Sequence, residues 1–294
     1  MSDGTAMTLS ADAPVLGFWR QFARRFRKST PAMVGLAFLI AMTAAVVFGP
    51  AVVPFAYDEQ DFTLIGSPGE MTSMHPLGTD ELGRDALARV VHGGRISLAV
   101  GLASALVATV LGTLVGALSG FYRGLMDSAL MRFTDIMLSI PLLPLVILLA
   151  GMLRPNVPFL IAIIGGLTWM GTARLVRSQF LALREREFVE AARALGVGGT
   201  RLIVRHILPN AIGPITVSAT LAVGNSILLE SALSFLGFGV QPPIPTWGNL
   251  LNNASPWLSV APWLAIPPGL CIFTTVLSVN FVGDGLRDAL EPRE

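Results

Sequence analysis

The chain has few charged residues and almost no cysteine. Only 13% of its 294 residues are Asp, Glu, Lys or Arg, whereas a soluble domain carries about 25%. The single cysteine, Cys271, has no second cysteine to pair with, which excludes a disulfide framework within the chain and a cysteine-pair metal site. The net charge of +1 does not indicate binding to nucleic acid.

Signatures of catalysis and nucleotide binding are also absent. A phosphate loop of the form G-x-x-x-x-G-K-[ST] does not occur, and no nucleophile stands beside a recognisable base. We therefore expect a chain that is not an enzyme, holds no cofactor or metal, and does not hydrolyse ATP itself.

Long uncharged runs are what the sequence has instead. No charged residue lies between Lys28 and Asp58, or between Arg95 and Arg123. A spanning helix needs about 20 mostly apolar residues, whereas membrane β-strands alternate over segments of about ten. The runs predict an all-α integral membrane protein with six transmembrane helices. We expect the spans at residues 33–55, 96–122, 136–153, 156–173, 211–229 and 258–282.

Positive charge is distributed unevenly between the segments that join these spans. If the N-terminus lies inside, all but four of the 20 lysines and arginines fall on the inner side. The four on the outer side are Arg84, Arg89, Arg95 and Arg154. Because Lys and Arg are enriched in cytoplasmic segments, we expect both termini in the cytoplasm. The expected domains are a cytoplasmic segment 1–30 and a transmembrane domain 31–294, with external loops 56–95 and 233–257 and a cytoplasmic loop 174–210.

The centres of the predicted spans carry no Asp, Glu, Lys, Arg or His. An ionisable residue within a span is the usual mark of coupling to an ion gradient. A secondary carrier or a channel is therefore the weaker hypothesis, although carbonyl and hydroxyl groups can also bind sodium.

The predicted cytoplasmic loop contains EFVEAARALGVGGTRLIVRHILPN at residues 187–210, which we call the coupling segment. Within it, Phe188, Ala191, Ala192 and Leu195 recur at helical spacing and predict one apolar stripe. Gly196 is placed to end that helix. Two small alanines suit close insertion into a groove of a partner protein. An amphipathic helix lying on the lipid surface fits the same residues equally well.

A resemblance favours the first of these interpretations. Residues 190–192 (EAA), Gly196, and residues 208–209 (LP) resemble the signature E-A-A-x₃-G-x₉-I-x-L-P of permease subunits in bacterial ABC importers. The chain departs from it at His206, which occupies the position of the isoleucine. In that family the loop forms a coupling helix that sits in a cleft of an ATPase subunit. The ATPase-coupling residues that the resemblance implies are Phe188, Glu190, Ala191, Ala192, Leu195 and Gly196.

Three further stretches narrow the resemblance. HPLGTDELGRD at 75–85, LSFLGFGVQPPIPTWGNLL at 233–251 and GDGLRDALEP at 283–292 are similar to the C-type permease of the dipeptide/oligopeptide/nickel branch. The likeness extends from about residue 20 to the end of the chain. It implies the type I ABC importer permease fold, with six spans and a cytoplasmic coupling helix, in the bacterial inner membrane.

The same resemblance implies the working assembly. A homologous permease would complete a heterodimer, two ATPase subunits would bind ATP, and an extracytoplasmic substrate-binding protein would deliver di- or oligopeptides. The branch also handles nickel and glutathione, so the substrate, the lining of the passage and the number of distinct ATPases stay open.

Other polar groups admit two interpretations. Asp80, Glu81 and Asp85 could bind a metal, but we favour Asp80 as the N-cap of a short amphipathic helix. His75 has no neighbour at ligand spacing, and we expect it at the surface. Ser218, Thr220, Asn225 and Ser226 could line a passage or hydrogen-bond between helices.

Overall fold

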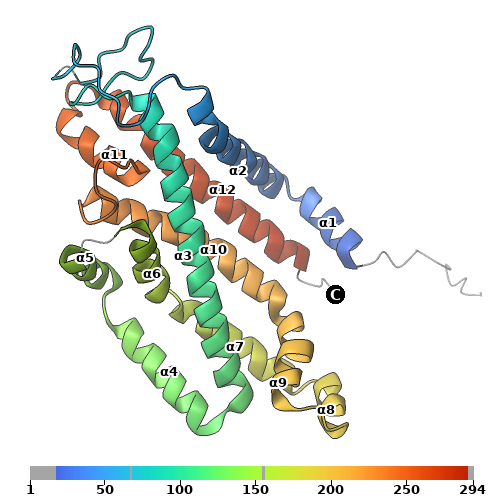
Figure 1. Ribbon diagram of the computed structural model, residues 1–294. Coiled ribbons are helices and arrows are strands. Elements are labelled where there is room, and N and C mark those ends of the chain that lie inside the picture. Colours follow the sequence, from blue (N-terminus) through green and yellow to red (C-terminus); the bar gives the residue numbers. More distant parts are fainter. Residues whose placement is uncertain (1–17, 67, 154–155, 291–294) are drawn as a thin grey trace, which may run out of the picture.

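The structure, a computed structural model, describes residues 18–66, 68–153 and 156–290, and within them it forms helices and no β-strand (Figure 1). The first helices are α1 (Phe18–Lys28), α2 (Thr30–Phe48), η1 (Gly49–Ala51), α3 (Ala86–Tyr122), α4 (Gly124–Ser139) and α5 (Leu142–Leu153). The middle ones are α6 (Val157–Gly166), α7 (Met170–Arg184), α8 (Glu187–Ala194), α9 (Gly199–Arg201), η2 (Leu202–Ile207) and α10 (Leu208–Phe235). The last are α11 (Trp247–Ala254), η3 (Ser255–Trp257), η4 (Pro262–Leu264) and α12 (Ile266–Leu290).

Four of these helical stretches are long and apolar enough to cross a membrane, and two bent pairs bring the number to six. The long stretches are Thr30–Ala51, Ala86–Tyr122, Gly199–Phe235 and Pro262–Leu290. The bent pairs are α4 with α5, at 81°, and α6 with α7, at 47°. The predicted all-α membrane fold is confirmed, but the third and fourth spans are broken helices.

Proline explains the sharper of the two bends. Pro141 stands between α4 and α5, and its ring disfavours the helical conformation of Ile140, whose ψ of 126° is extended. Arg154, which we placed at the turn after α5, lies outside the described residues, as do residues 1–17 and Arg293. The helices also begin and end several residues away from the predicted span limits, and α3 starts inside the predicted external loop 56–95.

Helix α3 runs through the middle of the bundle beside α7 (Figure 1). Gly112, Gly116 and Gly120 recur every four residues on the face that meets α7. A methyl group on Gly116 would come within 2.4 Å of the carbonyl oxygen of Ala173. The backbones therefore approach more closely than any larger residue allows, so α3 and α7 form one packed unit.

The segment between η1 and α3 covers the end of the bundle opposite α8 (Figure 1). His75 is buried, stacks on Phe55 and contacts Asp85 at 2.8 Å, so its predicted surface position is wrong. Asp85, not Asp80, caps α3 by accepting a hydrogen bond from the backbone N–H of Ala88. Asp80 instead accepts hydrogen bonds from Arg84 within a turn.

Helix α11 is anchored to the bundle by a buried polar network. Thr246 caps it, and the backbone N–H of Trp247 donates to the hydroxyl of Ser97 on α3 at 3.1 Å. The same hydroxyl donates to the carboxylate of Glu230 on α10 at 3.0 Å. Helices α3, α10 and α11 therefore meet at this buried carboxylate.

Candidate coupling site and cavity

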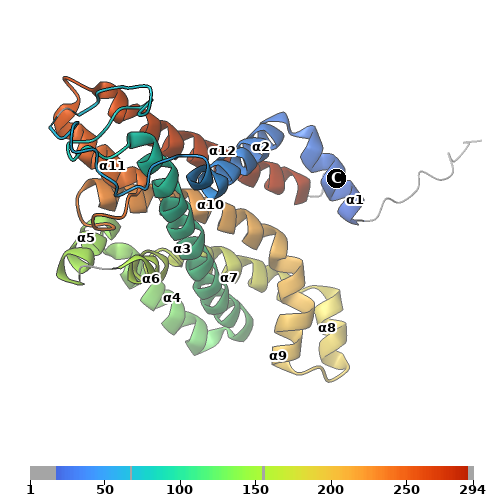
Figure 2. The same cartoon turned by 45° about the horizontal axis from the view of Figure 1, so that its top comes forward.

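Helix α8 projects from the end of the bundle opposite the covering segment (Figures 1 and 2). Its first turn carries Glu187 and Glu190 and its last turn carries Arg193, an order that favours the helix dipole. Val189 and Ala192 face inward and are buried. The outward surface carries Phe188, which is 42% exposed.

This arrangement corrects the predicted apolar stripe. Ala192 is only 7% exposed, so its side chain packs inside this chain and is not offered to a partner. Glu190, Ala191 and Leu195 are exposed, the last at 85%. The outward surface of α8 therefore combines a small residue with large apolar ones, while Val189, which we had not singled out, holds the helix in place.

Gly196 ends α8 in the way that the sequence indicates. Its φ of +79° is left-handed, a conformation that glycine adopts without strain. The N–H of Val197 bonds to the carbonyl of Ala192 at 3.1 Å, which satisfies a carbonyl left open at the helix end. Nothing lies within 4 Å of the position that a Cβ of Gly196 would take. Its role in this chain is the turn, and the space around it is open.

A hydrophobic cluster joins α8 to three longer helices. Val189 and Ala192 pack with Phe121 of α3, Phe180 of α7 and Ile207 beside the start of α10. Since each of these residues is less than a tenth exposed, α8 is mounted on the bundle by a packed core. A displacement of α8 must therefore act on α3, α7 and α10 together.

The chain leads from the turn into α10 without a break. Residues Gly199–Phe235 form one helical stretch of 37 residues, in which η2 is a π-helical segment. Single turns of π-helix are often found at functional sites. The predicted helix, glycine turn and helix before the fifth span are all present.

Ion pairs tie α7 to α4. Arg177 donates to both carboxylate oxygens of Asp127, at 2.6 and 2.7 Å. Arg174 pairs with Asp135 farther along the same two helices. The side chain of Asp127 is only 17% exposed, so its pair is better shielded from water than that of Asp135, at 59%. Sequence reasoning missed this connection, because spacing alone does not reveal pairs between helices.

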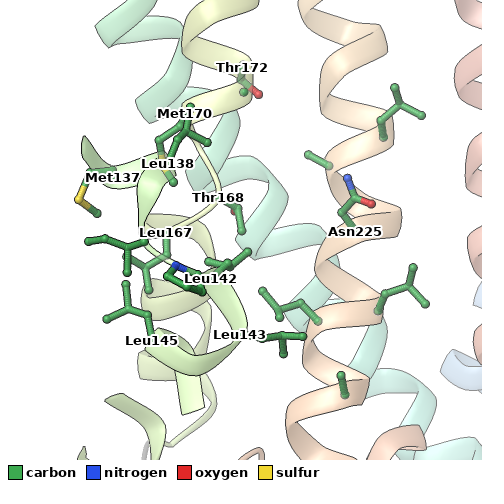
Figure 3. Close-up of a pocket in the computed structure, with 18 of the residues that line it drawn as sticks. Met137, Leu138, Leu142, Leu143, Leu145, Leu167, Thr168, Met170, Thr172 and Asn225 are labelled. Carbon is green, nitrogen blue, oxygen red and sulfur yellow. The ribbon is translucent and has the colours of Figure 1, made fainter. Parts of the chain in front are cut away.

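A cavity of about 920 Å³ lies beside α10, among α4, α5, α6 and α7 (Figure 3). The 81° bend between α4 and α5 supplies one wall, including Pro141 and Leu142. Residues of the α6–α7 junction and one face of α10 supply the others. None of the described lining residues is charged; their polar members are Thr168, Thr172, Ser218 and Asn225.

The predicted passage residues divide between the two sides of α10. Asn225 lines the cavity opposite Thr168 and Leu142 (Figure 3). Ser218 also lines it and shares a 3.0 Å hydrogen bond with Thr172. Ser226 is buried outside the lining, and Thr220 bonds to a carbonyl of its own helix. Of the predicted residues, Ser218 and Asn225 are thus the ones that face the cavity.

Comparison with known proteins identifies the class. Residues 112–294 match the family of the binding-protein-dependent transport system inner membrane component. Residues 17–68 match the N-terminal transmembrane domain of oligopeptide transport permease C. The chain belongs to this family of inner membrane transport permeases, which confirms the resemblance seen in the sequence.

Individual relatives cover nearly the whole chain. It is 44% identical over 276 residues to the oligopeptide transport system permease protein OppC of Escherichia coli strain K12, which covers 94% of this chain and 91% of that protein. It is 41% identical to OppC of Haemophilus influenzae, over 94% and 89% of the two chains. It is 38% identical to the glutathione transport system permease protein GsiD of Escherichia coli O6:K15:H31, over 98% and 95%.

Proposed function

We propose that this chain is one permease of an ATP-driven importer, and that α8 docks into an ATPase subunit. The observation that carries the proposal is the shape of α8, which exposes apolar residues among charged ones on its outer surface and packs its inner face into a buried core. An apolar residue as exposed as Leu195 costs free energy in water and gains it in a protein interface. Ala191, beside it, allows close approach of a partner surface.

The internal contacts offer a route from α8 to the cavity. The core beneath α8 includes Phe180 of α7. One turn away on α7, Arg177 forms an ion pair with Asp127 of α4. Helix α4 ends at Ser139, just before Pro141 at the bend that forms the cavity wall. A displacement of α8 by an ATPase would therefore reach the wall through α7 and α4, and through α10 directly.

The cavity supports a passage for uncharged backbone groups and varied side chains. Its apolar wall with a few hydroxyl and amide groups offers hydrogen bonds without selecting a charge. Relatives are named for oligopeptide and for glutathione transport, so we propose di- and oligopeptides as substrates. A homologous permease would complete the passage, and an extracytoplasmic binding protein would supply substrate and selectivity.

The proposed orientation has both termini and α8 in the cytoplasm of a bacterium. It rests on the arginines and lysines, which gather on the side of α8 and of the start of α2. In this arrangement ATP is bound by the ATPase subunits, and this chain has no enzymatic activity and no cofactor of its own.

A bulky residue on the outer surface of α8 tests the docking. Ala191→Trp should lower peptide uptake by a factor of about 5 to 150, because one large side chain in a packed interface costs about 1–3 kcal/mol. The same change should reduce the amount of ATPase that copurifies with the permease. The matched control is Ala182→Trp, an exposed alanine on α7 outside the coupling segment, which should retain uptake.

Two results would overturn the proposal. One is a double variant, with Ala191→Trp and Leu195→Asp, that takes up peptide and copurifies with the ATPase as well as the wild type does. The other is uptake that continues in membrane vesicles without ATP, which would indicate a secondary carrier or a channel. Membrane insertion of each variant is checked by the amount of protein in the membrane fraction.

A further inference from the structure

Helix α1 carries a strongly basic surface that the proposed transport function does not use. Its sequence FWRQFARRFRK holds four arginines, one lysine and no acidic residue in 11 residues. Ser29 alone separates it from α2, whose first residue, Thr30, opens a predicted span. The basic helix therefore lies directly before the first predicted span.

One face of α1 packs against the rest of this chain, whereas the opposite face is exposed. Phe22 and Phe26 are half-buried and their rings stack with centroids 6.2 Å apart. Phe26 lies against α12, so closely that a methyl group on Gly285 would come within 3.2 Å of its ring. The apolar face is thus largely covered by this chain and fixes the rotation of α1 about its own axis.

Arg20, Arg24 and Arg27 lie on the opposite face. They are four and three residues apart, which places them on one stripe of the helix. All three are exposed, and among the described residues none of them forms an ion pair. Helix α12, which packs beside α1 (Figure 2), has exposed carboxylates at Asp284 and Asp288. These do not pair with the stripe.

We propose that this arginine stripe binds anionic phospholipid headgroups of the cytoplasmic leaflet. An arginine fork matches the geometry of a phosphate oxygen pair. Four to eight cations next to a span are the pattern by which proteins recognise acidic lipids. An 11-residue helix is about 16 Å long, so all three arginines lie within about 16 Å of the end of α1 that adjoins the first span. Anionic lipid then fixes the cytoplasmic end of α12 through α1.

A simpler interpretation is that the charges only set the orientation of the chain during insertion. That role needs positive charge near the span but no particular helical face. The structure instead places Phe26 against α12 and aligns the arginines on the far side of α1. Charge complementarity with the adjoining membrane surface therefore favours lipid as the occupant. The inference rests on the proposed orientation but does not depend on the transported substrate.

Photocrosslinking to lipid tests the inference directly. The full chain, assembled with its partner subunits, is placed in phosphatidylethanolamine nanodiscs with a trace of photoreactive phosphatidylglycerol. Labelling of the 18–28 peptide is then measured by mass spectrometry. Arg20→Gln, Arg24→Gln and Arg27→Gln together should lower it about 100-fold, since each cation near an acidic surface contributes about fivefold, or about 1 kcal/mol. Substituting lysine at the same three positions keeps the charge and should keep most of the labelling.

Topology is followed separately through a Ser73→Cys substitution at an exposed residue of the segment before α3, labelled from outside the cell. If the glutamine triple variant inserts in the wrong orientation, Arg20→Gln with Arg24→Gln leaves three cations in place and serves instead. Equal labelling of wild type and a correctly oriented glutamine variant overturns the inference. So does crosslinking of the stripe to an ATPase subunit or to residues 291–294 in place of lipid. Because uptake is not the readout, failure of the lipid site is distinguishable from failure of the proposed transport function.

Discussion

The hydroxyl of Ser97 donates a 3.0 Å hydrogen bond to the carboxylate of Glu230, and both side chains are fully buried. Ser234 donates to the same carboxylate at 2.7 Å. Among the described residues no cation pairs with Glu230. Its hydroxyl partners alone satisfy it, and through Ser97 it holds the N-terminus of α11 against α3 and α10.

Removing both carboxyl oxygens of Glu230 should destabilise the protein more than replacing one of them. Glu230→Leu leaves the hydroxyls of Ser97 and Ser234 without their acceptor, at a cost of about 1–3 kcal/mol for each buried group. Glu230→Gln keeps one acceptor oxygen and should retain most of the stability. The apparent melting temperature of the detergent-solubilised protein measures the difference. Equal melting temperatures for the two variants would show that the network does not hold α11.

The pair between Asp127 and Arg177 should matter for transmission and not for insertion. Asp127→Asn replaces a two-bond ion pair by a neutral contact, and we expect peptide uptake by the assembled transporter to fall several-fold while ATP hydrolysis continues. Exchanging the charges, with Asp127→Arg and Arg177→Asp together, should restore part of the uptake.

Asp135→Asn is the matched control for that pair. Its partner is Arg174, and both side chains are more than half exposed, so this pair contributes about 0–1 kcal/mol. Uptake should change less than about twofold. If Asp127→Asn behaves like Asp135→Asn, the connection between α7 and α4 does not carry the motion.

How much of the structure can be predicted from the sequence depends on the kind of contact. Whether Asn225 faces a passage is left open by the sequence, and the structure is what places it at the cavity. The span number and the glycine turn at Gly196 follow from composition and periodicity. Which apolar residues face inward does not, because lipid is as apolar as a protein core. On α8, which lies outside the spans, the reason differs: apolar residues occupy both of its faces, so the sequence could not separate buried Val189 from exposed Phe188.

Contacts between distant segments could not be predicted from the sequence for a different reason. His75 is buried because Phe55 and Asp85 come together around it in the segment before α3. Ser226 points away from the cavity because the neighbouring helices decide which side of α10 faces the space. Neither arrangement produces a periodic sequence pattern from which it could be predicted.

A charge placed at Asn225 should make the cavity selective. Asn225→Arg puts a cation into a lining that has none among the described residues. At a separation of roughly 6 Å and an effective dielectric constant of 20, two cations repel by about 3 kcal/mol. Competition assays should show uptake of a lysine-rich peptide falling far more than that of a glutamate-rich one. Asn225→Gln is the control, and equal losses for both peptides would place the passage elsewhere.

Acid should loosen the turn at Asp61 in the segment before α3. Thr63 donates both its hydroxyl and its N–H to the Asp61 carboxylate, which lowers the pKa of this group below its usual 3.8; His75 acts in the same direction. Because the pKa is depressed in the folded state, the stabilisation is complete above pH 3.8 and is lost as the pH falls through the folded value.

Hydrogen exchange at the Thr63 amide, corrected for the intrinsic rate, measures this change. Thr63→Val removes the hydroxyl and should move the loss of protection at residue 63 to higher pH. An unchanged profile in that variant would mean that the hydroxyl does not govern the titration.

The continuous helical stretch Gly199–Phe235 is long enough that a small rotation at one end produces a large displacement at the other. At a rise of about 1.5 Å per residue, its 37 residues make a rod about 55 Å long. Pivoting such a rod by roughly 5° about its coupling end sweeps the far end through about 5 Å, one helical pitch. If an ATPase docks at α8 as proposed, a small tilt there would become a larger displacement at the opposite end of α10.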